Sequence, residues 1–281
     1  MASISINTNV LSIGMQNRLS QTTKELAASM ERLSTGKKIN SAADGAAQLS
    51  ISTQLNAQIS GNTIAQNNVQ QGVLSLDQAD ASLQLINTNL TKIRDLAVEA
   101  SNGIYSQEQR NALAAEAQEY VNQINTIAQT TTFNGLNILD GSITELKIQT
   151  GANAADRMDI SNAFVNSSAS ALGITASAIT NAFSSAANAN AFITNIDSAI
   201  AQTSSHLASV GAYSHSLNST LENLAVKQTN LESSNSLIMD VDYANEVSKY
   251  LHLEILQQTN ASLLSQANIQ PSLAYTLLQS I

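Results

Sequence analysis

Residues 193–238 read ITNIDSAIAQTSSHLASVGAYSHSLNSTLENLAVKQTNLESSNSLI and repeat apolar positions at alternating spacings of three and four. A mean repeat of 3.5 residues is typical of a helix that packs lengthwise against another helix. At about 1.5 Å per residue, such a helix would be about 70 Å long. The stretch therefore predicts a long coiled-coil helix. The positions in the series are Ile193, Ile196, Ile200, Thr203, Leu207, Val210, Ser214, Leu217, Leu221, Leu224, Gln228, Leu231, Asn235 and Ile238.

A second long helical segment lies earlier in the chain, between about residues 46 and 100. Its apolar positions keep one phase of the same spacing, and polar residues such as Asn62 and Asn87 occur within that phase. Polar residues in a helix seam fix its register at some cost in stability. After a break at residues 101–103, Ser106 and Gln109 have the spacing of a capping box that begins a further helix.

The two ends of the chain are also amphipathic. In residues 11–33 the spacings of the apolar series suit a nearly straight helix, and in residues 264–281 they alternate three and four up to Ile281. Neither end has a partner nearby in the sequence, so we expect them to pair with each other and to associate with other copies. The residues expected to carry self-assembly are Leu11, Met15, Leu19, Leu26, Leu33, Leu264, Ala267, Ala274, Leu278 and Ile281.

The middle of the chain differs from the helical segments. Phe133-Asn134-Gly135 is a turn signal, and two short alternating runs around residues 146–148 and 158–160 predict a β-hairpin within about residues 133–161. Residues 162–190 are rich in Ala, Ser and Asn and predict loop and weak helix. The predicted fold class is mainly α, an elongated helical bundle or coiled coil with a small β element.

Composition excludes several classes of function. The net charge of −9 argues against nonspecific binding to nucleic acid or to an anionic membrane, and the absence of Cys excludes disulfides and thiol catalysis. No apolar run approaches the roughly 18 residues of a membrane span, and the first residues do not resemble a Sec signal. The three histidines do not form a ligand motif, and Asp240 with Asp242 is too small a set for a metal site. We therefore expect no enzyme activity, cofactor or metal.

Several long motifs resemble bacterial flagellins, and they cover nearly the whole chain except residues 162–190. The N-terminal ones are INTNVLSIGMQNRL, ERLSTGKKINSAADGAA, TKIRDLAVEASNG and TTTFNGLNIL. The later ones are IQTGANAADRMDIS, DVDYANE and LQQTNASLLSQANIQPSLAYTLL. They occur in the order found in that family.

The resemblance implies a structural subunit of the bacterial flagellar filament. By analogy, residues 1–43 and 240–281 would form an inner domain of paired terminal helices, and residues 44–239 a shell domain that contains the β-hairpin. It also implies export by the flagellar type III apparatus, an extracellular location, and a homopolymer. Expected partners are an export chaperone at the C-terminal helix and the hook–filament junction and filament cap proteins.

The sequence departs from the family pattern at several charged positions. Ala43 and Gly45 replace a Lys and an Asp, and residues 236–240 lack the two usual arginines. Such departures leave a divergent or minor flagellin open. The alternative reading is a hook–filament junction protein, whose ends are similar to those of flagellin.

Residues 92–98 with Glu116 resemble the surface that a flagellin-sensing Toll-like receptor recognises in some relatives. By that match Lys92, Leu96 and Glu116 would be contact positions. The competing interpretation, which we favour, is that this helix surface serves subunit packing.

Overall fold

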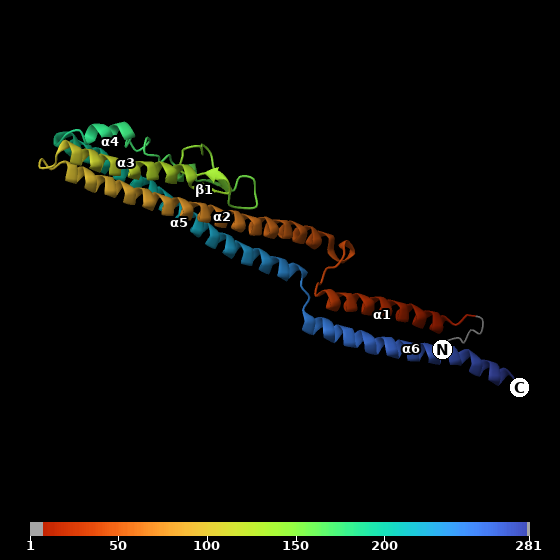
Figure 1. Cartoon of the computed structure of the whole chain (residues 1–281). Coiled ribbons are helices and arrows are strands. Elements are labelled where there is room, and N and C mark those ends of the chain that lie inside the picture. Colours follow the sequence, from red (N-terminus) through yellow and green to blue (C-terminus); the bar gives the residue numbers. More distant parts are fainter. Residues whose placement is uncertain (1–7, 280–281) are drawn as a thin grey trace. The chain divides into compact units, whose positions relative to one another are not determined.

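The computed structural model describes residues 8–279, with side-chain positions up to residue 269, and is mainly α-helical (Figure 1). This confirms the predicted fold class. The helices are α1 (Val10–Thr35), α2 (Ala42–Ala100), α3 (Gln107–Thr130), α4 (Ala176–Ala182), α5 (Ala186–Met239) and α6 (Tyr243–Gln279), with a short 3-10 turn η1 (Ser161–Ala163). The strands are β1 (Thr132–Phe133), β2 (Leu136–Asn137), β3 (Lys147–Gln149) and β4 (Arg157–Asp159).

The chain divides into two compact units. We call residues up to 57 and from 230 onward the end unit, and residues 58–229 the middle unit. Both boundaries fall inside the long helices α2 and α5. The end unit therefore combines the two ends of the chain, and the middle unit is one continuous piece of sequence.

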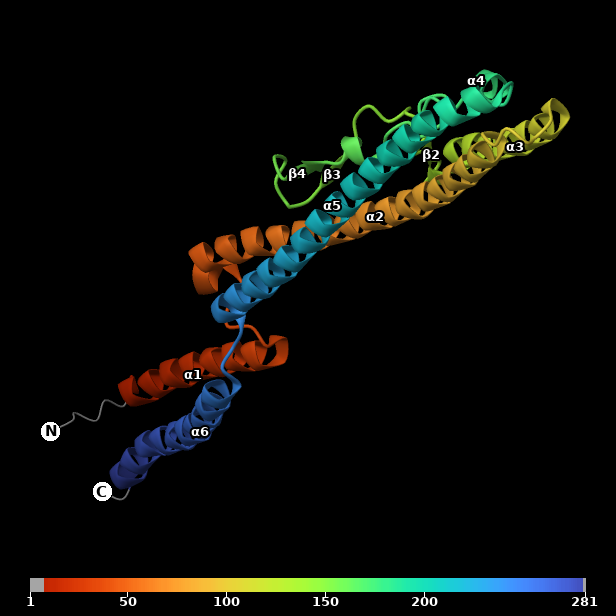
Figure 2. The ribbon, with the colours of Figure 1, turned by 90° about the vertical axis from the view of Figure 1, so that its left-hand side faces the viewer.

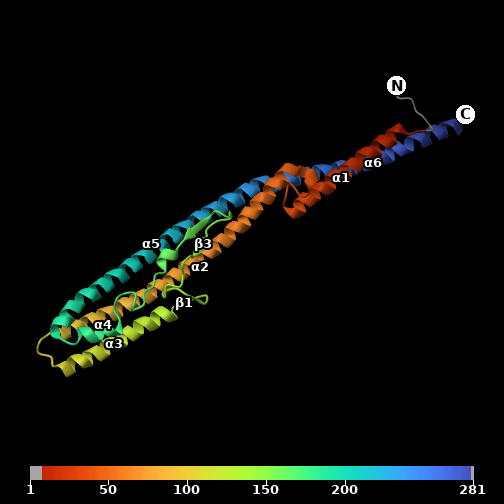
Figure 3. The ribbon, with the colours of Figure 1, turned by 90° about the horizontal axis from the view of Figure 1, so that it is seen from above.

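Within the middle unit, α2 and α5 run side by side and α3 lies along α2 (Figures 1 and 3). The predicted seam of α5 is realised between Ile193 and Leu224. Its members there are all buried or half-buried. Asn62 from α2 is fully buried and donates hydrogen bonds from Nδ2 to the carbonyl oxygen of Leu224 and to Oε1 of Gln228, both at 2.9 Å. An amide thus holds the register of the helix pair, as the polar seam position predicted.

The second face of α2 packs on α3. Ile86 and Ile93 have no exposed area and lie outside the single apolar phase that the sequence indicated for α2. They join Val121 and Ile124 of α3 in the same core. A helix that contacts two neighbours needs two apolar stripes, and the second stripe was missed because only one phase was followed.

Two small hairpins follow α3. In the first, Asn134 and Gly135 both have positive φ, 50° and 80°, which is the turn that an Asn-Gly pair favours between two short strands. In the second, β3 pairs antiparallel with β4 and Ile148 faces Met158, as predicted from the alternating runs (Figure 2). The structure therefore has two hairpins within residues 132–159, where the sequence indicated one.

Residues 162–190 contain η1, α4 and the connecting loops, as expected from their composition. Several of the largest fully buried side chains of the described residues nevertheless come from this stretch. Phe164 and Phe183 are almost fully enclosed, and Ile174 and Ile179 lie beside them in the core of the middle unit. Because this stretch has no periodic pattern, the sequence did not predict that its side chains pack in one core with those of α3 and α5.

In the end unit, α1 and α6 lie side by side. α1 ends at Thr35, and Gly36, which follows it, has φ 71° and donates its N–H to the carbonyl of Arg32. Immediately after it, the two chain segments form a short antiparallel bridge between Lys37 and Asp240. The amide of Lys38 donates to Met239 and that of Val241 donates to Gly36.

Candidate assembly surface

The contact between α1 and α6 in the end unit is antiparallel and combines polar with apolar side chains. Near one end, Asn9 Nδ2 donates to the carbonyl of Ala267 at 2.8 Å and Ser12 Oγ donates to Asn268 at 2.7 Å. Further along, Asn260 Nδ2 donates to Thr22 Oγ1 at 3.1 Å. At the other end, Arg32 Nη1 lies 3.4 Å from Glu246 Oε1.

The α1 side of this seam repeats every seven residues, at Ser12, Met15, Leu19, Thr22, Leu26, Ser29 and Leu33. Leu11, a predicted self-assembly residue, and Met30 lie outside this seam. Both are about half exposed, while their neighbours Ser12 and Ser29 are buried. Two helices that twist around each other follow a seven-residue repeat, and small hydroxyl side chains let the backbones approach closely.

A seam of this composition holds the helices weakly. The fully buried residues of α1 are Ser12, Thr22 and Ser29, and those in the described part of α6 are Leu253 and Ala267. Leu253 contributes about 1.5–3 kcal/mol by burial, and each hydrogen bond contributes about 0.5–1.5 kcal/mol net. These sums are small against the conformational entropy of ordering two long helices.

Large apolar side chains of the end unit lie instead on the outside. On α6, Val247, Leu251 and Ile255 are 42%, 51% and 62% exposed and follow one another every four residues. Side chains four apart share a helix face, so they form a stripe, which we call the α6 stripe. Further exposed apolar residues of the two helices are Val10, Leu11, Ile13, Met30, Leu256, Leu263 and Ile269.

The structure distributes the predicted self-assembly residues between the seam and the outside. Leu11 is exposed, and Ala267 is buried in the seam. Half-buried at the seam are Met15, Leu19, Leu26, Leu33 and Leu264. Ala274 and Leu278 belong to α6 beyond the described side chains, and Ile281 lies outside the described residues. The α6 stripe was missed, although its four-residue apolar spacing was readable in the sequence.

Polar side chains cap the first turns of α2 and α6, the two helices that begin after the bridge between Lys37 and Asp240. Asp242 accepts hydrogen bonds from the amides of Ala244 and Asn245 and so caps α6. At the start of α2, Asp44 Oδ2 accepts hydrogen bonds from the side chain and backbone of Ser41 and from the Asn40 amide. These hydrogen bonds, those from Ser41 foremost, hold the pKa of Asp44 below its ordinary value.

The residues matched to a receptor surface lie in the middle unit. Lys92 and Glu116 are exposed, whereas Leu96 is 9% exposed and belongs to the core. Nearby, Arg94 Nε donates to Asp197 Oδ1 at 2.7 Å and joins α2 to α5. Leu96 therefore packs within its own chain, and its burial does not test whether this helix surface serves subunit packing.

His206, one of the three histidines considered as metal ligands, contacts a serine of the same unit. His206 Nδ1 lies 3.2 Å from Ser167 Oγ, and burial lowers the pKa of the imidazole. Among the described residues, no group of three or more acidic or histidine side chains could hold a metal ion. Within the same part of the chain, no helix is long and apolar enough to cross a membrane.

The described residues thus form a pair of terminal helices with apolar side chains on its outside, and a unit of long packed helices; this is the build of a helical structural protein. The model of the bacterial flagellin N-terminal helical region matches residues 6–144, and that of the C-terminal helical region matches residues 193–278. The chain belongs to the bacterial flagellin family. This is a family of structural proteins, not of enzymes, and its members are subunits of the flagellar filament.

Two individual relatives are similar in sequence to this chain along almost its whole length. A flagellin of Halalkalibacterium halodurans is 32% identical over 98% of this chain and 99% of its own length. A flagellar filament 31.3 kDa core protein of Treponema maltophilum has the same identity and the same coverage. The crystal structure of Bacillus cereus flagellin superposes with a TM-score of 0.50 at 29% identity, and covers 60% of this chain and 94% of the other.

A putative flagellar hook-associated protein from Vibrio parahaemolyticus also has this fold. Its structure matches 70% of this chain and 99% of its own with a TM-score of 0.59, at 14% identity. At that identity the likeness shows a shared fold alone. The hook–filament junction alternative is therefore not better supported than the filament subunit.

Proposed function

We propose that this filament subunit polymerises by covering the exposed apolar residues of its end unit with the end units of neighbouring copies. One observation carries the proposal. In the α1–α6 pair the hydroxyl residues Ser12, Thr22 and Ser29 are buried, while the large apolar residues Leu251 and Ile255 are exposed. Contiguous apolar surface of this kind marks a contact with another macromolecule. In a homopolymer that macromolecule is a second copy.

The exposure of these apolar residues also supports a position for the paired terminal helices in the interior of the filament. A two-helix pair with so little buried apolar area gains most of its stability from contacts with neighbours. The end unit would then order fully on assembly and line the interior of the filament. The middle unit has its own core and would fold before assembly to form the shell.

The location and the further partners are proposals that follow from family membership. We infer export by the flagellar type III apparatus to the cell exterior, with a chaperone that shields the C-terminal helix beforehand. The α6 stripe is a suitable surface for that chaperone, because it is apolar and unpartnered within residues 8–279. Contacts with the junction and cap proteins would use the same end unit.

Recognition by a Toll-like receptor would involve Lys92 and Glu116 on the surface of the middle unit. Leu96 would act through the packing beneath them, since it is 9% exposed. Receptor activation by monomer with Lys92→Ala or Glu116→Ala, compared with the unmodified chain, tests this part.

Electron microscopy of purified chain tests the assembly proposal. The triple variant Val247→Ser, Leu251→Ser, Ile255→Ser should fail to form long fibres, while its middle unit unfolds at an unchanged temperature. The matched control His252→Ser, Gln258→Ser changes exposed polar residues of the same helix and should polymerise normally. Normal fibres from the triple variant would contradict the proposal.

A further inference from the structure

Two asparagines of the chain, Asn102 and Asn134, are followed directly by glycine. Because glycine has no Cβ, its backbone nitrogen is the least hindered nucleophile that can attack Cγ, the side-chain carbonyl carbon of the preceding asparagine. Both asparagines are exposed to solvent. The two dipeptides therefore have the same chemistry in the sequence, and the structure places them in different surroundings.

Asn102 lies in the loop of residues 101–106, which joins α2 and α3 at their far end in Figure 1. Its side-chain oxygen Oδ1 accepts a hydrogen bond from the amide of Ile104 at 3.2 Å. This is the oxygen on which negative charge develops when a nucleophile attacks Cγ. A hydrogen-bond donor already aimed at such an oxygen lowers the barrier to the attack.

The backbone around Gly103 has room for the attack. A Cβ built on this glycine would meet no atom within 4 Å. Its φ is not positive, so the residue does not hold a turn that only glycine can form. The peptide between Asn102 and Gly103 can therefore turn towards Cγ without displacing a neighbour.

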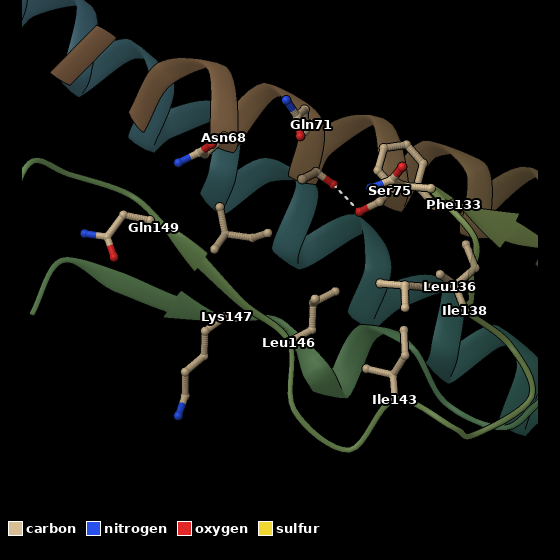
Figure 4. Close-up of a pocket in the computed structure, with 13 residues that line it drawn as sticks. Asn68, Gln71, Ser75, Phe133, Leu136, Ile138, Ile143, Leu146, Lys147 and Gln149 are labelled. Atoms are coloured by element: carbon tan, nitrogen blue, oxygen red, sulfur yellow. Dashed lines mark hydrogen bonds between the residues drawn. The ribbon is translucent and has the colours of Figure 1, made fainter. Parts of the chain in front are cut away.

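Asn134 lies in a turn that the fold holds in place. Its φ is 50° and that of Gly135 is 80°. On either side of the turn, Phe133 pairs with Leu136. Figure 4 shows both of these residues lining a groove of about 300 Å³ between α2 and the hairpins. The peptide that follows Asn134 would have to rotate out of the turn before its nitrogen reached Cγ, and the strand pairing resists that rotation.

Asp140 also precedes a glycine and has similar local hydrogen bonding, because its Oδ1 accepts from the amide of Ser142 at 2.8 Å. Hydrogen bonds, those from Ser142 foremost, hold the pKa of this carboxyl below its ordinary value. The group is therefore ionised at neutral pH. An ionised carboxylate is a poor electrophile, so the same geometry does not make Asp140 reactive.

We propose that Asn102 is a site of spontaneous deamidation. The Gly103 nitrogen gives its proton to a solvent base and forms a bond to Cγ of Asn102, while the bond between Cγ and Nδ2 breaks. Nδ2 takes a proton from water and leaves as ammonia. Water then opens the resulting succinimide ring to aspartate or isoaspartate, and nothing is oxidised or reduced.

The product changes the end of α2. The amide of Asn102 donates to the carbonyl of Glu99 at 3.1 Å, so residue 102 lies beside the last turn of the helix. A new negative charge there opposes the partial negative charge at the helix C-terminus. Isoaspartate also lengthens the backbone by one CH₂ group, which disturbs the hydrogen bond from the Tyr105 amide to the carbonyl of residue 102.

Peptide mass spectrometry of the full chain after incubation at mildly alkaline pH tests the proposal. The mass increase of deamidation should accumulate several-fold faster at Asn102 than at Asn134. In urea the two rates should become similar, because strand pairing then no longer holds the turn at Asn134. Equal rates in the folded chain, or the same ratio of rates with and without urea, would overturn the proposal.

Gly103→Ala is the matched variant, since the structure has room for the added methyl group and the φ of this residue is not positive. The methyl group stands beside the attacking nitrogen, so deamidation at Asn102 should fall several-fold while the rate at Asn134 is unchanged. Isoelectric focusing should show a more acidic species that accumulates in the unmodified chain and far less in the variant. Deamidation at Asn102 that is as fast in Gly103→Ala would contradict attack by this nitrogen.

Discussion

Asn62 of α2 donates its side-chain N–H to the backbone carbonyl of Leu224 in α5, at 2.9 Å, inside the seam between the two helices. The acceptor oxygen Oδ1 of the same amide is buried and has no hydrogen-bond partner. The contact therefore fixes which turn of α2 faces which turn of α5, and it does so at a cost in stability.

Replacement of Asn62 should separate these two effects. Asn62→Ala leaves a small cavity and loses both hydrogen bonds, so it should lower the free energy of unfolding of the middle unit by about 1–3 kcal/mol. Asn62→Leu fills the space and removes the unpartnered oxygen, so its thermal midpoint should equal or exceed that of the unmodified chain. Thermal unfolding followed by circular dichroism measures both. A Leu variant less stable than the Ala variant would show that the amide stabilises the pair.

The seam of the end unit offers a matched pair of serines. Ser29 Oγ is buried without a hydrogen-bond partner, whereas Ser12 Oγ donates to Asn268 at 2.7 Å. Ser29→Ala should leave the α1–α6 pair as stable or slightly more stable, and Ser12→Ala should weaken it by about 0.5–1.5 kcal/mol. Hydrogen exchange of α6 amides reports on the pair without interference from the middle unit. The reverse order of protection would be evidence against the described seam.

Leu96 and Lys92 lie on the same helix, Leu96 in the core of the middle unit and Lys92 on its surface. Leu96→Ala removes core volume and should destabilise the middle unit by about 2–5 kcal/mol. Lys92 is exposed, so Lys92→Ala should change stability by less than about 0.5 kcal/mol. Urea unfolding of monomer measures the difference. A Leu96→Ala variant as stable as Lys92→Ala would contradict the core position of Leu96.

His206 should make the stability of the middle unit depend on pH. Burial lowers the pKa of its imidazole in the folded chain, so the unfolded chain binds the proton more readily. Stability should therefore be constant above the unfolded pKa of about 6.5 and fall as the pH drops from there towards the lower folded value. His206→Gln should lack this slope. Unfolding midpoints between neutral and mildly acidic pH measure it, and identical slopes in both chains would contradict the expectation.

Much of the middle unit was readable from the sequence. The α5 series from Ile193 to Leu224, the hairpin with Ile148 opposite Met158, and the cap at Ser106 all depend on neighbours a few residues apart. The second stripe of α2, with Ile86 and Ile93, was not recognised because it exists only when a third helix packs there. The same holds for Phe164 and Phe183, whose surroundings in sequence carry no periodic signal.

The sequence by itself determined the helices, their breaks and the family, because repeats, caps and turn residues act over a few positions of the chain. Only the tertiary structure decided which side of α1 meets α6. Leu11 and Ser12 are adjacent, and either phase of the helix could have faced a partner. Close approach of two backbones favours small hydroxyl side chains in the seam and leaves Leu11 outside.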